Sequence, residues 1–414
     1  MNFKSHAQTL AEFIQKYSSI WKKEIMNEYP ETIDDYPIEW INLLDSLSPQ
    51  ELYDVDCKCD VPKIHGTSFH EFMQEIQSLS QVESIPDSPE VPLEDWAFQG
   101  VKKKKRHEIQ KIVPVLKKVK ADTGFEYVID IGGGVGHLSR ILSHYHSIAS
   151  ISIDQNTEFQ KIGLNRLQKY RRLEGAADVT FMNLTFGLDT DEENLKLVFN
   201  KKALGLGLHT CGPLANTLIK ASADYKTQGL LSFGCCYHQL TPQKDFPISG
   251  FYKTEQLPVL NLYGFTLATR SHAGMDFDSY MTKMKVKSYR YALHLFIMKH
   301  FNSNQYTSVG ECHMSLYTKP FHHYIKEKLA ELGLLHSFTD EYFNQYFESA
   351  EIQRQLRVMF LCNIIRWQMG RVLEIYLLVD RCVYLEEQGY KVDLQQYFDE
   401  NLSPRNLGIL ALHK

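Results

Sequence analysis

The spacing of apolar side chains in the first 85 residues is typical of helices. Between residues 5 and 85 they recur three or four positions apart, and Ser48 followed by Pro49 is a helix-start signal. The apolar positions that carry the pattern are Leu10, Phe13, Ile14, Tyr17 and Trp21, then Ile38, Trp40, Ile41, Leu43 and Leu44, then Phe69, Phe72, Ile76 and Leu79. Residues 80–92 contain three prolines and many polar groups, which predicts a linker. We therefore expect a helical N-terminal region over residues 1–95.

Short apolar runs then alternate with helical segments over residues 100–265. This alternation is typical of a parallel sheet covered by helices, the α/β class. Strands are predicted at 127–131, 148–154, 178–183, 203–209, 229–236 and 262–268. Residues 320–335 and 340–390 return to a helical pattern, and 407–413 form a last apolar run. We expect a sheet domain at 96–300 and, at 301–414, a helical insertion whose final strand returns to the sheet.

Composition narrows the class of protein. The chain has 414 residues, 43% of them hydrophobic, so it can bury a large core and is not disordered as a whole. A net charge of −5 does not fit a protein held to nucleic acid by its overall charge, although a local basic patch is compatible with it. No stretch is apolar for eighteen residues, so no membrane span is expected and no DNA or membrane partner is predicted. Eight scattered cysteines and no signal-like N-terminus predict a reducing compartment, cytoplasmic or nuclear.

The segment after the first predicted strand has the residues of a nucleotide-binding turn. The strand contains Asp130, glycines follow at 132, 133, 134 and 136, and a helical pattern opens at His137. Glycine lets the backbone approach a ligand closely, and the free N–H groups of a helix start attract negative charge. The spacing differs from the G-x-G-x-x-G of dinucleotide-binding proteins. Asp-x-Gly-x-Gly-x-Gly instead resembles motif I of class I S-adenosylmethionine (SAM) methyltransferases.

Each predicted cofactor residue has an expected role. Gly132, Gly134 and Gly136 would admit the methionine end of SAM, and Asp130 would orient its amino group. Asp154 ends the second strand, roughly twenty residues beyond the glycines, where a carboxylate can bind the ribose hydroxyls. Asn183, at the end of the third strand, would reach the adenine edge or belong to a plain loop.

Two later strand ends are rich in cysteine and histidine. Ligands of a doubly wound sheet lie at the carboxyl ends of its strands, so these side chains are expected to gather on one rim. They are His209, Cys211, Cys235, Cys236 and His238. They could shape a methyl-acceptor pocket in which a neutral histidine takes a proton, bind a zinc ion, or, for the paired cysteines, pack as small apolar groups.

A basic run opens the helical pattern of residues 101–119. Lys102 to Arg106 are five consecutive cations. They could contact phosphate groups, act as a nuclear-import signal, or form the solvated start of a helix.

Five motifs together resemble those of the methyltransferase-like protein 25 family. Lys104-Lys-Arg-His-Glu108 looks like the Lys-Lys-x-His-Glu that precedes the first strand in that family, although Lys102 and Lys103 stand where its members often have Ser-Pro. The others are the glycine turn at 130–139, the strand ends His209-Thr-Cys-Gly212 and Gly234-Cys-Cys-Tyr-His238, and the tail Leu402-Ser-Pro-Arg-Asn-Leu407. The resemblance implies a class I fold, SAM binding and methyl transfer.

These features predict a SAM-dependent methyltransferase on a doubly wound sheet. Its acceptor is expected to be a macromolecule, RNA or protein. His209-Thr-Cys-Gly212 stands where adenine dimethylases place Asn-Leu/Pro-Pro-Tyr/Phe, so methylation of the adenine amine is not indicated. The alternative is a scaffold protein that binds SAM or zinc without catalysis.

Overall fold

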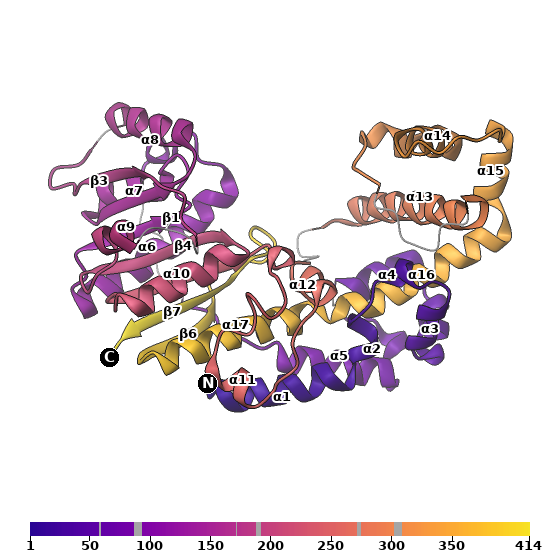
Figure 1. Cartoon of the computed structure of the whole chain (residues 1–414), viewed down its shortest axis with the longest axis horizontal. Coiled ribbons are helices and arrows are strands. Elements are labelled where there is room, and N and C mark those ends of the chain that lie inside the picture. The colour runs from indigo at the N-terminus through magenta and orange to yellow at the C-terminus, as the bar shows by residue number, and fades with distance from the viewer. Residues whose placement is uncertain (58, 87–92, 171, 188–191, 271–274, 302–308) are drawn as a thin grey trace. The chain divides into compact units, whose positions relative to one another are not determined.

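The structure is a computed structural model that describes residues 1–57, 59–86, 93–170, 172–187, 192–270, 275–301 and 309–414 (Figure 1). Two compact units make up the chain. The sheet unit comprises residues 1–16, 78–274 and 370–414, and the helical unit comprises residues 17–77 and 275–369.

A seven-stranded sheet organises the sheet unit. Its strands are β1 (Tyr127–Ile131), β2 (Ala149–Asp154), β3 (Val179–Asn183), β4 (Ala203–Cys211), β5 (Gly229–Cys235), β6 (Tyr390–Gln396) and β7 (Leu407–His413), in the order β3-β2-β1-β4-β5-β7-β6. Strands β1 to β5 are parallel, and β7 runs antiparallel to both of its neighbours. The first five strands lie where the sequence predicts them, and the last strand returns to the sheet as expected.

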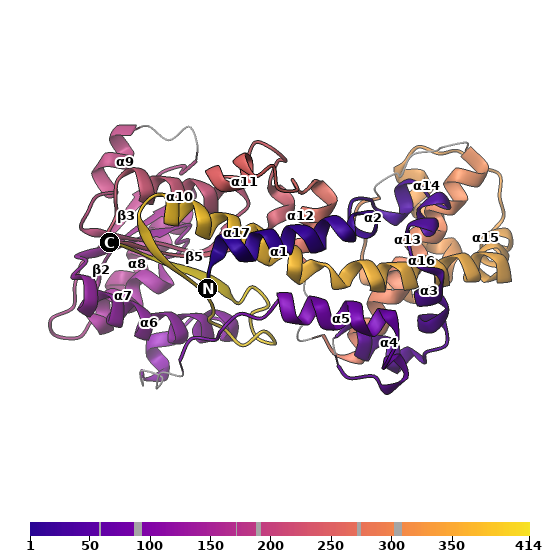
Figure 2. The same cartoon turned by 90° about the horizontal axis from the view of Figure 1, so that it is seen from below.

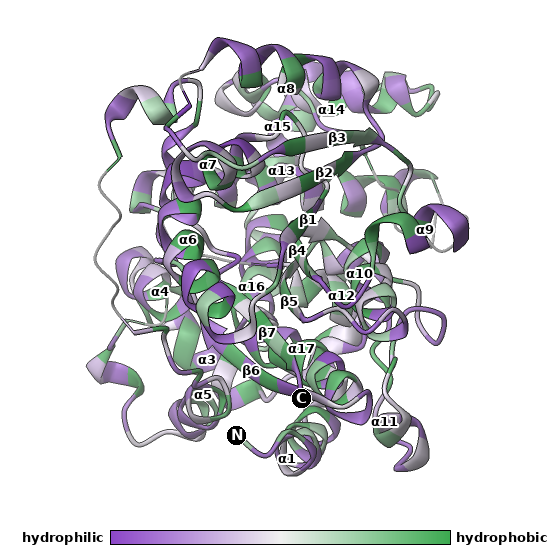
Figure 3. Cartoon of the chain, turned by 90° about the vertical axis from the view of Figure 1, so that its left-hand side faces the viewer, coloured by the Kyte–Doolittle hydropathy of each residue, from purple (hydrophilic) through white to green (hydrophobic). Residues whose placement is uncertain are grey.

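Helices cover both faces of this sheet (Figure 3). On one face, α6 (Lys103–Thr123) and α7 (His137–His146) place Ile112, Leu116 and Ile141 in a core with Val128 of β1 and Phe233 of β5. On the other face, α10 (Pro213–Asp224) packs on β4 and β5, and α17 (Gly370–Glu387) packs on β6. Burial on both faces explains why β4 and β5 are almost continuously apolar. The remaining flanking helices are α8 (Thr157–Lys169) and α9 (Glu192–Val198).

One predicted strand is wrong, and one strand of the sheet was not predicted. Residues 262–268 form a helix, α12 (Leu262–Ala268), rather than a strand, because the Asn261 side chain accepts hydrogen bonds from the N–H groups of Tyr263 and Gly264 and caps a helix there. Residues 390–396, which begin where the predicted helical pattern of 340–390 ends, form a strand, β6. Its buried Tyr390, Val392 and Leu394 alternate with exposed residues, the period of a strand.

The units also begin and end at other positions than the expected domains. Helix α1 (Phe3–Lys16), expected in a helical N-terminal domain, packs along α17 in the sheet unit (Figure 2). The short helix α11 (Gly250–Thr254) contacts α17 as well. The predicted linker lies partly outside the described residues, and in its described part Ile85 N–H donates to the Gln396 carbonyl of β6. Local periodicity reveals none of these contacts, because the partners are far apart in the sequence.

The helical unit contains α2 (Ser18–Trp21), α3 (Ile38–Asp45), α4 (Pro49–Asp56), most of α5 (Ser68–Leu79), α13 (Phe277–Phe301), α14 (Phe321–Glu331), α15 (Asp340–Glu348) and α16 (Ala350–Gln368). The predicted start signal at Ser48 is a full capping box, in which Ser48 Oγ accepts from Glu51 N–H and Glu51 accepts from Ser48 N–H. None of the helices in the described part of the chain combines the length and apolarity needed to cross a bilayer.

Candidate functional site

The glycine turn connects the end of β1 to the start of α7. Gly132 and Gly134 have φ angles of +71° and +58°, and a Cβ atom at either position would meet nothing within 4 Å. Their backbone therefore presents a bare surface, which suits close approach of a ligand. At Gly136 the space is filled, since a Cβ there would lie 2.6 Å from the Phe181 ring. The three predicted glycines thus serve two needs, ligand access and internal packing.

Asp154 lies at the end of β2 and holds the turn in place. Its Oδ2 accepts a hydrogen bond of 2.9 Å from Gly134 N–H, and its Oδ1 accepts one of 2.8 Å from Asn156 N–H. The carboxylate is partly exposed. It is therefore fixed next to the glycine backbone while it keeps a surface for a ligand.

Asp130 lies underneath the turn. Its side chain is 3% exposed, and its Oδ2 accepts a hydrogen bond of 2.8 Å from Ser139 Oγ. Burial raises the pKa of Asp130 to about 6, against the opposing effects of Ser139 and Lys105. The carboxyl group supports the turn from inside the protein, and little of it is available for direct contact with a ligand.

A cavity of about 430 Å³ opens at the carboxyl ends of β1, β2 and β4. It is lined by Ile131, Gly132, Ile153, Asp154, Gln155, Leu184, Phe186, Gly187, Cys211, Pro213, Leu214 and Thr217. Its volume lies in the range of small-molecule sites, and its wall combines apolar side chains with one carboxylate and bare glycine backbone. These residues fit a ligand with an apolar ring, a diol and a charged end, as SAM has.

Asn183 does not line this cavity. Its Nδ2 donates hydrogen bonds of 3.2 Å and 3.1 Å to the carbonyls of Asp154 and Gln155, and the residue is exposed. The side chain secures the backbone after β2, and its contact with an adenine edge stays a prediction.

His209 is tied to two distant segments through one carboxylate. Its Nε2 donates to Glu108 Oε1 at 2.8 Å, and Ser403 Oγ donates to the same oxygen at 2.8 Å. Glu108 is fully buried on α6, whereas the His209 side chain is 25% exposed at a bulge of β4 with φ +67°. Burial acts to raise the pKa of Glu108, but His209, Ser403 and Lys105 outweigh it and hold that pKa below its usual value.

Three cysteine thiols gather at the ends of β4 and β5. The Sγ atoms of Cys211 and Cys235 are 3.2 Å apart, and all three Sγ atoms, including that of Cys236, lie within 4.8 Å of one another. Hydrogen bonding from Cys235 lowers the pKa of Cys211 to about 6. The pKa of Cys235 is raised, chiefly because its thiol donates to Cys211, and burial raises the pKa of Cys236. His238 is exposed, so of the five rim residues it is the least enclosed.

Sequence reasoning assigned no role in this site to Glu108 or Ser403, although both stand in motifs that carry the family resemblance. Glu108 has a recognisable signal, because it falls in the apolar stripe of α6 one turn before Ile112, and a charged residue in such a stripe needs a buried partner. Ser403 stands in the tail motif, but its contact with Glu108 has no local signal, since only the tertiary fold brings the tail to α6.

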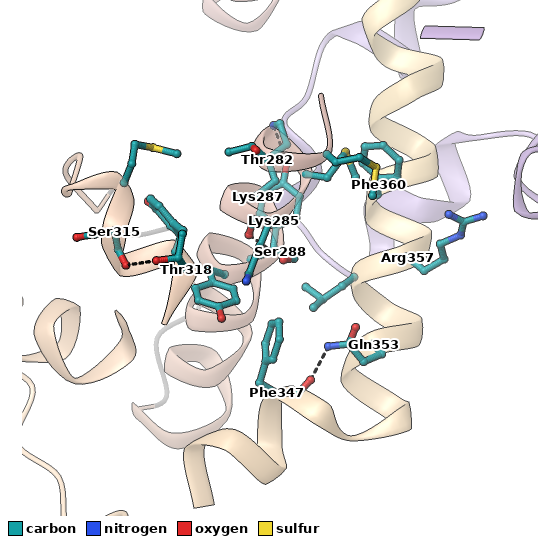
Figure 4. Close-up of a pocket in the computed structure, with 17 residues that line it drawn as sticks. Thr282, Lys285, Lys287, Ser288, Ser315, Thr318, Phe347, Gln353, Arg357 and Phe360 are labelled. Carbon is teal, nitrogen blue, oxygen red and sulfur yellow. Dashed lines mark hydrogen bonds between the residues drawn. The ribbon is translucent and has the colours of Figure 1, made fainter. Parts of the chain in front are cut away.

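A second cavity, of about 960 Å³, lies in the helical unit between α13, the short turn η6 (Met314–Thr318) and α16 (Figure 4). Eight of the 17 residues that line it are methionine or aromatic, among them Met281, Tyr289 and Phe360. None of the predicted site residues belongs to this cavity.

The strand order with a reversed β7, the glycine turn after β1 and the carboxylate at the end of β2 define a class I methyltransferase domain. A family model described as a methyltransferase domain matches residues 104–243. The cofactor of this domain is S-adenosylmethionine, as the sequence predicts.

The chain is similar to probable methyltransferase-like protein 25 of Mus musculus, with 25% identity over 285 residues, and of Homo sapiens, with 27% identity over 233 residues. These matches cover 63% and 51% of this chain, and they confirm the resemblance that the motifs indicate. They span 45% and 37% of the relatives, so the chain matches less than half the length of either. Among solved structures, coclaurine N-methyltransferase bound to N-methylheliamine and SAH aligns over 97% of this chain and 99% of its own, with 10% identity and a TM-score of 0.26.

Proposed function

We propose that this protein transfers a methyl group from SAM to a nucleophilic atom of a macromolecule at the carboxyl ends of β4 and β5. One observation carries the proposal. Cys211 lines the same cavity as Gly132 and Asp154, and it stands two residues from His209, which Glu108 holds in place. The cofactor side and the predicted acceptor side therefore adjoin each other.

The residues of the cavity would hold and orient the cofactor. Bound SAM supplies an electrophilic methyl group on a sulfonium, so the protein chiefly has to align the acceptor for an in-line displacement. Asp154 would accept hydrogen bonds from the ribose hydroxyls while its bond to Gly134 N–H keeps the turn in position. Asp130 would act beneath the turn rather than through direct contact.

His209 would position the acceptor group. With Nε2 engaged by Glu108, the ring is fixed in one orientation, and within the described residues its Nδ1 has no hydrogen-bond partner. That nitrogen is thus available to an incoming hydroxyl or amine. Buried carboxylates commonly orient a histidine in this way.

Between the two classes of acceptor, RNA is favoured by the basic start of α6. Lys102, Lys103 and Lys104 are exposed, and Lys104 Nζ lies 3.7 Å from Glu108 Oε1. Lys104 therefore stands about one helical turn before the carboxylate that holds His209, and Lys102 and Lys103 directly precede it. Phosphate groups of a nucleic acid would be attracted to them.

The test is transfer of tritiated methyl from SAM into fractionated cellular RNA and protein. We expect label in RNA, and a fall of about tenfold at low salt when Lys103→Ala and Lys104→Ala are combined, with the difference between variant and wild type shrinking as salt rises. Lys161→Ala, which removes an exposed lysine paired with Glu158 on α8, is the matched control and should transfer normally.

Tritium label found only in the protein fraction would contradict the proposal that RNA is the acceptor. Binding of S-adenosylhomocysteine without transfer into either pool would favour the alternative of a SAM-binding scaffold.

A further inference from the structure

We propose that Cys211, Cys235 and Cys236 bind one zinc ion at the ends of β4 and β5. Their Sγ atoms, which come from two adjacent strands, lie within 4.8 Å of one another. Thiolates are preferred ligands of zinc, and three of them leave one position of a tetrahedral site open. This inference does not depend on methyl transfer.

Two departures from regular strand geometry bring the thiols together. The register between β4 and β5 shifts between Leu208 and Thr210, and this shift sets Cys211 opposite Cys235. Cys236 then takes a left-handed conformation, with φ +53°. Consecutive residues of a strand point to opposite faces, so without this conformation Cys236 would point away from Cys235. Left-handed backbone is uncommon outside glycine, which makes its use here informative.

A buried cation next to the cluster needs an anionic partner. Arg381 of α17 is 3% exposed and has no carboxylate within ion-pair distance in the described part of the chain. Its Nε donates to Asn216 Oδ1, but its Nη1 has no hydrogen-bond partner there. A Cβ on Gly234 would lie 2.4 Å from that Nη1, so the guanidinium faces the strand end directly before Cys235.

A zinc ion bound by three thiolates would be the anionic partner of Arg381. Two positive and three negative charges leave a net charge of minus one beside Arg381, and buried charges are ordinarily paired. Apolar packing explains the cluster less well, because Cys211 and Cys236 are both partly exposed. A disulfide between Cys211 and Cys235 would leave both Cys236 and Arg381 unexplained.

The open position of the metal would face the cofactor cavity, because Cys211 lines it. No histidine or carboxylate atom among the described residues joins the three thiols in the same cluster. Zinc sites with three protein ligands are typical of catalytic sites, in which water or a substrate atom completes the shell.

The experiment measures metal in the purified full-length chain by mass spectrometry after expression with added zinc and removal of free metal. We expect one zinc per chain in the wild type and in Cys59→Ser, which replaces an exposed cysteine of the helical unit. Cys235→Ser combined with Cys236→Ser should lower zinc affinity by at least about tenfold. Cobalt titration of the wild type, read by thiolate-to-cobalt absorption, tests the ligands without any variant.

Wild-type protein that binds neither zinc nor cobalt, or a double variant that keeps its zinc, would overturn the proposal. A Cys211–Cys235 disulfide in freshly purified protein, detected by thiol counting, would do the same. Bound zinc without methyl transfer would leave this inference intact and contradict the proposed function, so the two can fail separately.

Discussion

One buried carboxylate, Glu108, connects three segments that the sequence keeps far apart. It receives hydrogen bonds from His209 of β4 and Ser403 of the tail while it sits in the apolar stripe of α6. The motifs that carry the family resemblance, at 104–108, 209–212 and 402–407, therefore meet at one side chain. The sequence alone identifies the motifs, but the contact that joins them requires the tertiary structure.

Replacing Glu108 by glutamine should destabilise the protein and loosen His209. Because a buried carboxylate that accepts hydrogen bonds from His209 and Ser403 loses its charge, the free energy of unfolding should fall by about 1–3 kcal/mol. Chemical denaturation measures this. Glu126→Gln, which breaks the exposed 2.9 Å pair with Lys202, is the control and should change stability by less than about 1 kcal/mol. Equal effects of the two changes would show that the buried contacts contribute nothing.

Asp130 should make stability depend on pH. Because its pKa is raised to about 6 in the folded protein, from an ordinary value of 3.8, the native state binds more protons between those values. Its contribution is therefore fully present below about pH 4 and is lost as pH rises through 6. At about 1.4 kcal/mol per pKa unit, the loss is up to about 3 kcal/mol.

Asp130→Asn should remove this dependence while it keeps an acceptor for Ser139 Oγ. Denaturation at pH 4 and pH 7.5 compares the two proteins. The variant should gain stability relative to the wild type only at the higher pH. An equal difference at both pH values would show that the carboxyl group titrates normally.

At the scale of elements, the spacing of apolar residues predicts most strands of the sheet. It fails where a single residue, such as a helix cap, determines the type of element. The run 262–268 is apolar enough for a strand, yet the Asn261 cap makes it a helix. β6 alternates buried and exposed residues as a strand does, but only a short turn at Gly389 separates it from the long helix α17, and the sequence analysis did not predict it. The glycine turn was predictable in position and residue type. The use of Gly136 for packing against Phe181 was not, because Phe181 comes from β3.

Comparing Gly136→Ala with Gly124→Ala separates the cost of a clash with Phe181 from the cost of backbone strain. A Cβ at Gly136 would lie 2.6 Å from the Phe181 ring, and φ there is +66°. Gly124 ends α6 with a similar φ of +71° and open space around it, so Gly124→Ala isolates the strain, about 1 kcal/mol. Gly136→Ala should cost about 1–3 kcal/mol more by thermal or chemical unfolding. Identical losses at the two positions would mean that Phe181 simply moves aside.

At the scale of the whole molecule, the sheet unit is built from three separate stretches of chain. Residues 370–414 supply α17, β6 and β7, and residues 1–16 supply α1. Sequence reasoning anticipated the returning strand but not these other segments. Contacts between distant stretches leave no periodic trace. The cysteines were expected on one rim of the sheet, but the position of Arg381 of α17 next to them became visible only in the folded structure. The cofactor residues, in contrast, follow one another along β1, the glycine turn and β2, so their order in the sequence was enough to predict the cofactor site.

The most direct measurement is calorimetric titration of the full-length protein with SAM. The account predicts one SAM bound per chain, and affinity at least about tenfold weaker in Asp154→Ala, which loses the carboxylate beside the glycine turn. Asp178→Ala, which changes a carboxylate that is 94% exposed, should bind like the wild type. A folded wild-type protein that binds neither SAM nor S-adenosylhomocysteine would contradict the account.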